Sequence, residues 1–200
     1  MSSAPGLRER KRMRVRMTIR QEALRLFTER GYDKTTVEQI AEAAEVANTT
    51  FFRYFPSKEH VVFADEYDVP LREAITSRPE DEPLLVAVRN GITEFCRTSL
   101  VADQEELLTR LQLIDRVPAL RSRLPQHQRD ESDFMADFLA RRMGCEPDDL
   151  VVRVLVGVLG SMVAEVLLAW ARAGGEQPLE DLFAKLFDEM SQVFSEVGAG

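Results

Sequence analysis

The stretch that decides the fold is GYDKTTVEQIAEAAEVANTTFFRYFPSKE, residues 31–59. Thr35 followed by Glu38 has the form of a capping box, which predicts the start of a helix, and apolar residues then recur on one helical face. A tight connection leads to a third, very short helix over 49–55. Pro56 ends that helix because the residue before a proline is driven out of the helical region. The pattern therefore predicts two short helices joined by a tight turn.

A longer helix precedes this stretch. Its apolar residues fall at i, i+4, i+7 and i+8 and form one face: Ile19, Ala23, Leu26 and Phe27. Gly31 then takes the position at which helices commonly end in a left-handed residue. Three short helices with a tight turn between the second and the third predict a helix-turn-helix, a DNA-binding unit that we expect to span residues 14–60. We expect Ser57 to cap a further helix over 58–69 that links this unit to the rest of the chain.

The charge of the chain is divided in a way that suits DNA at one end only. The formal net charge is −8, yet residues 1–60 hold 12 basic and 8 acidic side chains, a balance of +4. Such asymmetry favours contact with nucleic acid or another anionic surface. Residues 1–13 are polar and basic and predict a flexible arm, which either reaches the minor groove or the DNA backbone or is simply solvated.

The composition argues against several other classes of protein. Cys96 and Cys145 fit neither a disulfide framework nor a metal site, and with two histidines a zinc site or a catalytic triad is not expected. No nucleophile–base pair and no paired carboxylates stand out, so we expect neither an enzyme nor a cofactor. The basic start does not resemble a signal peptide, and the most apolar run, residues 154–164, is shorter than the roughly 20 residues that span a bilayer. We therefore expect a cytoplasmic protein without a membrane span.

Residues 61–200 predict a larger domain that is helical throughout. Helices are expected over residues 84–99, 103–117, 126–143, 147–173 and 179–197, separated by segments that contain proline or glycine. Strand-like alternation never runs for more than a few residues. The expected fold class is therefore all-α, with an N-terminal three-helix helix-turn-helix domain followed by a larger helical domain.

The outward face of the third helix carries the residues that we expect to read DNA. Phe51 and Phe55 point to the core, which leaves four side chains on the other side: Asn48, Thr49, Phe52 and Arg53. Asn can pair bidentately with adenine and Arg with guanine, while Thr or Phe can touch a thymine methyl group. Phe52 could instead be a further core residue. Phosphate contacts are expected from Thr50, Tyr54 and Lys58, and from free backbone N–H groups at Thr36.

In sequence these motifs resemble the TetR family of bacterial transcriptional regulators. The resemblance covers roughly residues 14–62 and rests on three pieces in order, ALRLF (23–27), GYDKTTVEQIA (31–41) and TFFRYFPSKE (50–59). It implies a homodimer, usually a repressor, that binds a double-stranded DNA operator, with a C-terminal domain that binds a small effector and dimerises through its last two long helices. From the matching positions, the resemblance implies that Asn48, Thr49 and Phe52 contact bases. It likewise implies that Thr50, Tyr54 and Lys58 contact phosphates.

Two residues of the turn depart from the family pattern. Glu45 stands where the family usually has glycine, and a positive φ there would cost a non-glycine residue on the order of 1 kcal/mol. Ala47 stands where the family often has a capping serine, which makes Asn48 the nearest capping residue. Asn48 is therefore expected either to cap the third helix or to read a base, because one side chain cannot do both.

The resemblance also implies an effector pocket among the middle helices. Its candidate lining residues are Phe95, Leu107, Leu111, Phe134, Met135, Phe138 and Met162, each of which is more simply explained as plain core. Arg110, with Arg116, Arg121 and Arg123, could bind an anionic group at the mouth of the pocket. Residues 113–121 are similar to a subset of TetR-like regulators that sense acyl-CoA-like ligands.

A small hydrophobic or acyl-CoA-like effector is therefore expected. It would shift the helix over 58–69 and with it the separation of the two recognition helices. The alternative is a helical lipid-binding or acyl-carrier-binding protein without specific DNA recognition.

Overall fold

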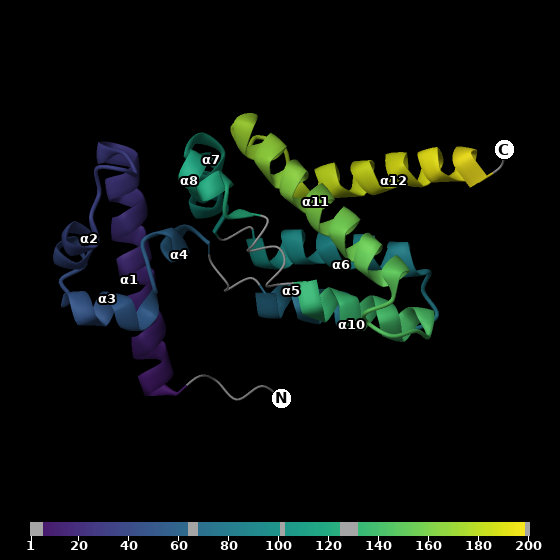
Figure 1. The fold of residues 1–200 in the computed structure, drawn as a ribbon, viewed down its shortest axis with the longest axis horizontal. Helices are drawn as coiled ribbons and strands as arrows, with labels where there is room; N and C mark the ends of the chain where they lie inside the picture. The colour runs from purple at the N-terminus through teal and green to yellow at the C-terminus, as the bar shows by residue number, and fades with distance from the viewer. Residues whose placement is uncertain (1–5, 64–67, 101–102, 125–131, 199–200) are drawn as a thin grey trace. The chain divides into compact units, whose positions relative to one another are not determined.

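The computed structural model describes residues 6–63, 68–100, 103–124 and 132–198. Within these ranges the chain is helical, with no β-strand, so the predicted all-α class is confirmed (Figure 1). The chain divides into two compact units, Met1–Ala64 and Asp65–Gly200. The division falls a few residues after the domain boundary predicted at residue 60.

The N-terminal unit is built from four helices. These are α1 (Leu7–Arg30), α2 (Val37–Ala43), α3 (Asn48–Tyr54) and α4 (Glu59–Val62). Both α2 and α4 pack on α1, and α3 packs on α2. Their shared core consists of side chains that are almost fully buried: Ile19, Ala23, Leu26, Phe27, Ile40, Phe51, Phe55, Val61 and Val62. The apolar face predicted for the first helix is therefore the face that holds the unit together.

Helix α1 begins earlier than the sequence analysis predicted. The expected flexible arm covered residues 1–13, whereas the helix starts at Leu7, with Gly6 at its N-cap. Residues 1–5 lie outside the described residues. Arginine, lysine, methionine and glutamate favour helices even where a segment has no apolar face. The prediction of an unstructured segment was therefore wrong for residues 7–13, because high charge was taken as a sign of disorder.

The single linking helix predicted over 58–69 is also not observed. Helix α4 ends at Val62, and Phe63 has an extended backbone with ψ 97°. Residues 64–67 lie outside the described residues. A new helix, α5 (Asp68–Thr76), follows with Pro70 in its first turn, where a proline removes no hydrogen bond of the helix.

Among its described residues, the C-terminal unit has helices in all five segments that the sequence predicted, together with two helices that it did not predict. The predicted ones are α6 (Leu84–Phe95) with its π-helical continuation η1 (Cys96–Leu100), α7 (Gln104–Arg116), α10 (Ser132–Met143), α11 (Leu150–Arg172) and α12 (Leu179–Gly198). The additional ones are α5 and the short α8 (Pro118–Arg121), which begins at a proline that was taken as a separator. Of the predicted helix over 126–143, residues 126–131 lie outside the described residues.

Helices α6 and α11 organise the packing of this unit. Helix α6 contacts α5 and α12, whereas α11 contacts α7 and α10. The approach of α6 to α5 is very close, because a Cβ on Gly91 would lie 2.8 Å from the Cα of Ile75. Cys96 is buried at the end of α6, and burial raises the pKa of its thiol to about 12. This thiol is therefore a packed side chain of low reactivity, as predicted.

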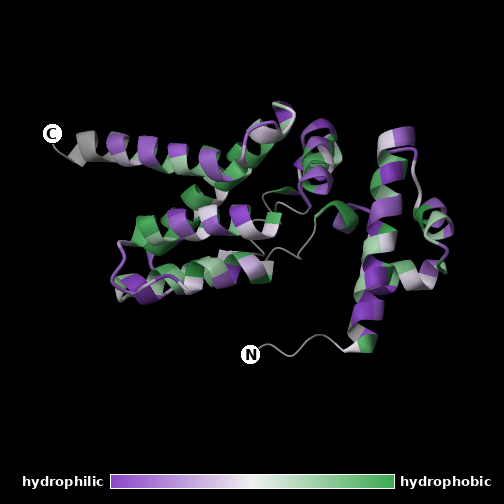
Figure 2. Cartoon of the chain, turned by 180° about the vertical axis from the view of Figure 1, so that it is seen from behind, coloured by the Kyte–Doolittle hydropathy of each residue, from purple (hydrophilic) through white to green (hydrophobic). Residues whose placement is uncertain are grey.

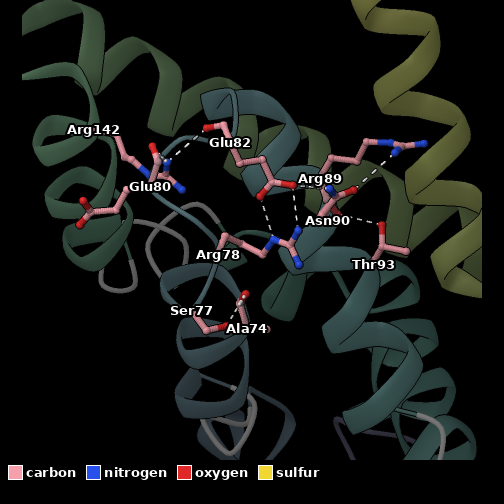
Figure 3. Close-up of polar contacts among 9 residues, drawn as sticks. All are labelled: Ala74, Ser77, Arg78, Glu80, Glu82, Arg89, Asn90, Thr93 and Arg142. Carbon is pink, nitrogen blue, oxygen red and sulfur yellow. Dashed lines mark hydrogen bonds and ion pairs between the residues drawn. The ribbon is translucent and has the colours of Figure 1, made fainter.

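A polar cluster fixes the loop between α5 and α6 to α10 (Figure 3). Arg78 donates two hydrogen bonds of 2.8 Å to the Glu82 carboxylate, and Asn90 donates a third of 2.7 Å. These bonds, Arg78 foremost, lower the pKa of Glu82 to about 2. From α10, Arg142 donates to the backbone oxygens of Glu80 and Glu82 at 2.6 and 3.2 Å. The cluster thus joins the loop both to the neighbouring helix α6 and to α10, which lies about 60 residues later in the chain.

Helix α11 is the most apolar element of the described chain. By length and composition its 23 residues could cross a membrane, with a mean hydropathy of 2.2 and 22% burial over its most apolar window. The shorter run considered in the sequence analysis stopped at Arg153 and Glu165, so the argument from length does not hold for the whole helix. A core helix of a soluble protein meets the same criterion. Large apolar side chains are exposed on its N-terminal half: Leu150, Val151, Val154 and Val158.

Candidate nucleic-acid interface

The inward face of α3 is formed by two phenylalanines. Phe51 and Phe55 are 0% and 1% exposed, and their ring centroids lie 5.9 Å apart. Phe51 lies within α3 and Phe55 directly follows it, so the two buried rings fix which side of α3 faces the core. The prediction that these two residues belong to the core is confirmed.

Four side chains are exposed on the other side of the helix, and they are the ones predicted to read bases: Asn48, Thr49, Phe52 and Arg53. Phe52 is 53% exposed, and its ring meets the Phe51 ring edge to face, with the centroids 5.5 Å apart. The alternative interpretation of Phe52 as a core residue is therefore wrong. An exposed aromatic ring beside an exposed amide, hydroxyl and guanidinium is a surface suited to the edges of base pairs.

The start of α3 decides between the two roles considered for Asn48. Ala47 is the N-cap residue, and no side chain forms a capping hydrogen bond at this end. Asn48 is the first residue inside the helix and its side chain is exposed. The interpretation of Asn48 as a cap is therefore wrong, and its amide is placed to reach a partner outside the unit.

The turn between α2 and α3 is a Schellman motif with a glutamate in the left-handed position. The Val46 N–H donates to the Ala41 carbonyl at 2.9 Å and the Glu45 N–H to the Glu42 carbonyl at 3.1 Å. Glu45 has φ 54°, so the positive φ considered for this position is present. This turn holds the angle between the two helices at the expense of backbone strain in Glu45.

The start of α2 is capped one residue later than predicted. The capping box joins Thr36 and Gln39, where the sequence analysis expected Thr35 and Glu38. The Thr36 N–H donates to Gln39 Oε1 at 3.0 Å, and the Gln39 N–H donates to the Thr36 hydroxyl at 3.3 Å. The Thr36 N–H is therefore not free for a phosphate, because the capping box uses it, and a phosphate contact by the other N–H groups at the start of α2 stays a prediction. Thr35 is buried instead, and its hydroxyl donates to the Gly31 carbonyl at 2.9 Å.

Lys58 has a structural role that the sequence analysis missed. Its ammonium donates to the backbone oxygens of Tyr32 and Thr35, at 2.9 and 3.2 Å, and lies 4.2 Å from the centroid of the Tyr32 ring. The residue thereby holds the loop between α1 and α2 against the start of α4. A phosphate contact by Lys58 would have to use its remaining N–H. The neighbouring Ser57 does not cap α4, because its hydroxyl donates to the Glu59 carboxylate.

The remaining predicted phosphate ligands lie at the edge of α3. Thr50 and Tyr54 are half-buried, and the Arg53 guanidinium lies 5.4 Å from the centroid of the Tyr54 ring. A residue of α1 joins this edge: the Arg16 guanidinium lies 4.9 Å from the centroid of the Phe55 ring. Arg16 lies three residues before Ile19 and seven before Ala23, on the apolar face of α1, and this spacing could have indicated the contact.

The predicted effector residues are mostly core residues of the C-terminal unit. Those with at most 9% exposure are Phe95, Leu107, Leu111, Phe138, Met162 and the charged Arg110. Phe134 and Met135 are half-buried, and the Arg72 guanidinium lies 4.8 Å from the centroid of the Phe134 ring. Arg121, by contrast, is exposed and pairs with Asp115 at 3.1 Å. The part of these residues in ligand binding stays a prediction.

A helix-turn-helix whose second helix exposes polar and aromatic side chains, joined to a larger helical domain, defines a DNA-binding transcriptional regulator. Residues 19–64 match the family described as bacterial regulatory proteins, tetR family, and residues 82–195 match the MftR C-terminal domain. The chain belongs to the TetR family of transcriptional regulators. Regulators of this family bind DNA operators and act as dimers.

Two curated relatives are named as transcriptional regulators and not as enzymes, as expected for this chain. The regulator TcmR of Streptomyces glaucescens is 33% identical, over 84% of this chain and 78% of the relative. The transcriptional repressor AcnR of Corynebacterium diphtheriae is 28% identical, over 82% of this chain and 85% of the relative. Among solved structures, FadR of Thermus thermophilus, a repressor in complex with lauroyl-CoA, is 25% identical with a TM-score of 0.52. The match covers 85% of this chain and 90% of that one.

Proposed function

We propose that this protein is a repressor that binds a palindromic operator as a homodimer and is released by a small hydrophobic or acyl-CoA-like effector. The observation that carries the proposal is the exposed face of α3: Asn48, Thr49, Phe52 and Arg53. Repression is favoured by the names of AcnR and FadR, both of which are called repressors. As a regulator of transcription it would act in the cytoplasm, where bacterial DNA lies.

Each of the four side chains has a definite counterpart in the major groove. The Arg53 guanidinium can donate to O6 and N7 of guanine, and the Asn48 amide can pair with N6 and N7 of adenine. Thr49 and Phe52 can contact thymine methyl groups. Thr50 and Tyr54, at the edge of the helix, would hold phosphates and so set its register along the groove.

The dimer is supported by the exposed apolar face of α11. Leu150, Val151, Val154 and Val158 are 76%, 53%, 54% and 42% exposed, which is costly for a helix in water. A second copy of the chain would cover this face, together with α12. A twofold dimer would then place two recognition helices about 34–36 Å apart, on successive turns of the same face of DNA.

The effector is supported by one structural relative and one buried charge. FadR of Thermus thermophilus binds lauroyl-CoA, and its fold matches over most of this chain. In this chain Arg110 is only 6% exposed on α7, between Leu107 and Leu111. A buried guanidinium among apolar side chains is suited to an amphipathic ligand with an anionic group.

Selection of duplexes from a random library tests DNA recognition. We expect a palindrome whose half-sites lie about 10–10.5 base pairs apart, centre to centre, or a multiple of that spacing. Arg53→Ala should weaken binding to the selected duplex by about 10- to 100-fold, the loss of one bidentate base contact. Arg30→Ala is the matched control, since Arg30 is also exposed but lies at the far end of α1. Enrichment of no sequence would favour the alternative, a helical lipid-binding protein.

Calorimetry with lauroyl-CoA and with lauric acid tests the effector. We expect lauroyl-CoA to bind and to release the selected duplex, and Arg110→Gln to weaken that binding. Leu85→Gln is a control on an exposed position of the same unit. Absence of binding heat and of DNA release with both ligands would rule out an acyl-CoA-like effector and leave the DNA-binding proposal intact.

A further inference from the structure

Helix α1 extends well beyond the part of the chain that matches the DNA-binding family. The match begins at residue 19, whereas the helix begins at Leu7. Figure 1 shows these N-terminal turns continuing past α3, and Figure 2 shows that most of their residues are hydrophilic. The segment from residue 7 to residue 18, here called the basic extension, therefore continues the DNA-binding unit without adding to its core.

Five of the six cations of the basic extension, all but Lys11, lie on two distinct faces. Arg8, Arg12 and Arg16 are spaced at i, i+4 and i+8, and so continue the face that carries Ile19 and Ala23. Ile19 and Ala23 are buried against the rest of the unit. Arg8, Arg12 and Arg16 are therefore on the side of α1 that carries α2, α3 and α4.

Arg16 marks the point at which the core ends. It is half-buried, and its guanidinium lies 4.9 Å from the centroid of the Phe55 ring. Phe55 is the residue that directly follows α3. One and two turns further along the same face, Arg12 and Arg8 are exposed. The helix thus carries two exposed guanidinium groups past the C-terminal end of the recognition helix.

We propose that Arg8 and Arg12 form a second DNA-binding element that grips the phosphates flanking the bases read by α3. The inference rests on the proposed function, since α3 must lie in the groove for this face to meet the backbone. Residues four apart in a helix are separated by about 6 Å along its axis. Each DNA strand presents a phosphate about every 3.4 Å, so both guanidinium groups find partners without bending the helix.

The other face of the basic extension provides an internal control. Arg10 and Arg14 are also exposed, and they lie with Met13 and Met17 along the shallow hollow on the surface of α1. Arg8→Gln/Arg12→Gln and Arg10→Gln/Arg14→Gln remove the same charge from the same helix. Any difference between the two double variants therefore reports which face meets DNA and not the total charge of the protein.

The salt dependence of binding is the measurement. The probe is the duplex selected by the wild-type protein, extended by about one helical turn of unrelated sequence on each side. For each phosphate that the protein no longer neutralises, the slope of log K against log salt should fall by about 0.9. We expect a fall of up to about 3.6 for the Arg8→Gln/Arg12→Gln dimer and less than about 1 for Arg10→Gln/Arg14→Gln. Equal slopes for the two double variants would overturn the proposal.

A second pair of variants tests whether the helix itself matters. Met13→Pro breaks α1 between the two arginines and the core, whereas Met13→Ala keeps the helix and the charges. Met13 is 52% exposed, so neither change empties a core position. If a rigid helix positions Arg8 and Arg12, Met13→Pro should lower the slope as much as the double variant does, and Met13→Ala should leave it almost unchanged. An unchanged slope for Met13→Pro would show a flexible arm and overturn the proposal.

Two further outcomes separate this proposal from its alternatives. If no duplex can be selected, the proposed function fails before the basic extension is tested. If the protein binds vesicles that contain phosphatidylglycerol, loses that binding in Arg8→Gln/Arg12→Gln and keeps its DNA slope, then the partner of the basic extension is an anionic membrane and the proposal is wrong.

Discussion

The candidate residues of the two units differ in exposure, and the difference decides how far each site can be argued. On α3 the four predicted base readers are exposed while their neighbours Phe51 and Phe55 are buried. In the C-terminal unit the predicted ligand residues are mostly buried like the core around them. Packing within the chain does not account for the residue types on an exposed face, whereas it fully accounts for a buried apolar residue.

The same contrast holds for the ends of two helices. Helices α2 and α11 both end in a Schellman motif, in which the residue after the C-cap has a positive φ. At α11 this residue is Gly174, with φ 80°, and at α2 it is Glu45, with φ 54°. The C-terminal unit thus uses the unstrained residue, while the DNA-binding turn carries a strained one.

The largest expected difference lies between two variants that each truncate one phenylalanine, a buried one in the C-terminal unit and an exposed one in the N-terminal unit. Phe138 is 2% exposed and Phe52 is 53% exposed. Phe138→Ala should lower the free energy of unfolding by about 3–5 kcal/mol, because it leaves a cavity. Phe52→Ala should change it by less than about 0.5 kcal/mol. Urea denaturation followed by the helical circular dichroism of the whole chain measures both, because the single tryptophan, Trp170, reports on the C-terminal unit alone. A comparable loss for Phe52→Ala would mean that this ring supports the fold.

Smaller effects are expected at the two Schellman turns, where one substitution should raise the free energy of unfolding and the other should lower it. Glu45→Gly should raise the free energy of unfolding by up to about 1 kcal/mol, because it relieves the left-handed strain. Gly174→Ala should lower it by about 1 kcal/mol for the same reason. Thermal denaturation measures both changes. Glu45→Ala is the control, since it removes the carboxylate but keeps the strain. If Glu45→Gly and Glu45→Ala behave alike, the backbone is not the cause.

The smallest effect is expected at the polar cluster around Glu82 (Figure 3). Its carboxylate has a pKa of about 2 in the folded chain and an ordinary value of 4.5 when unfolded. The stabilisation is therefore present above pH 4.5 and is lost as the pH falls towards 2. Glu82→Gln should lower stability near neutral pH and flatten the loss of stability across that acidic range, which urea denaturation at a series of pH values measures. Glu80→Gln, whose exposed side chain is outside the cluster, should keep the wild-type pH profile.

Much of the DNA-binding unit could be predicted because its signals are local. Apolar spacing in α1, Pro56 after α3 and the glycine-like position of Glu45 each act within a few residues. Long-range contacts could not be predicted. The carbonyls that hold Lys58 lie 26 and 23 residues earlier in the chain, which no local pattern reveals.

Two other gaps in the sequence prediction have physical reasons. The helical start of α1 was missed because a charged segment without an apolar face can be helical when it continues a helix that is already fixed by packing. The effector residues could not be distinguished from core because both are apolar and buried. Exposure, which the sequence does not contain, is the property that separates the predicted readers on α3 from the core.

The central claim is that the exposed face of α3 reads bases, and the sequences bound by two proteins test it most directly. Duplexes should be selected in parallel with the wild-type protein and with Arg53→Ala. The account predicts a palindrome for both, with a guanine preference at one position of each half-site that disappears symmetrically in Arg53→Ala. The same preference at every position in both selections would contradict it.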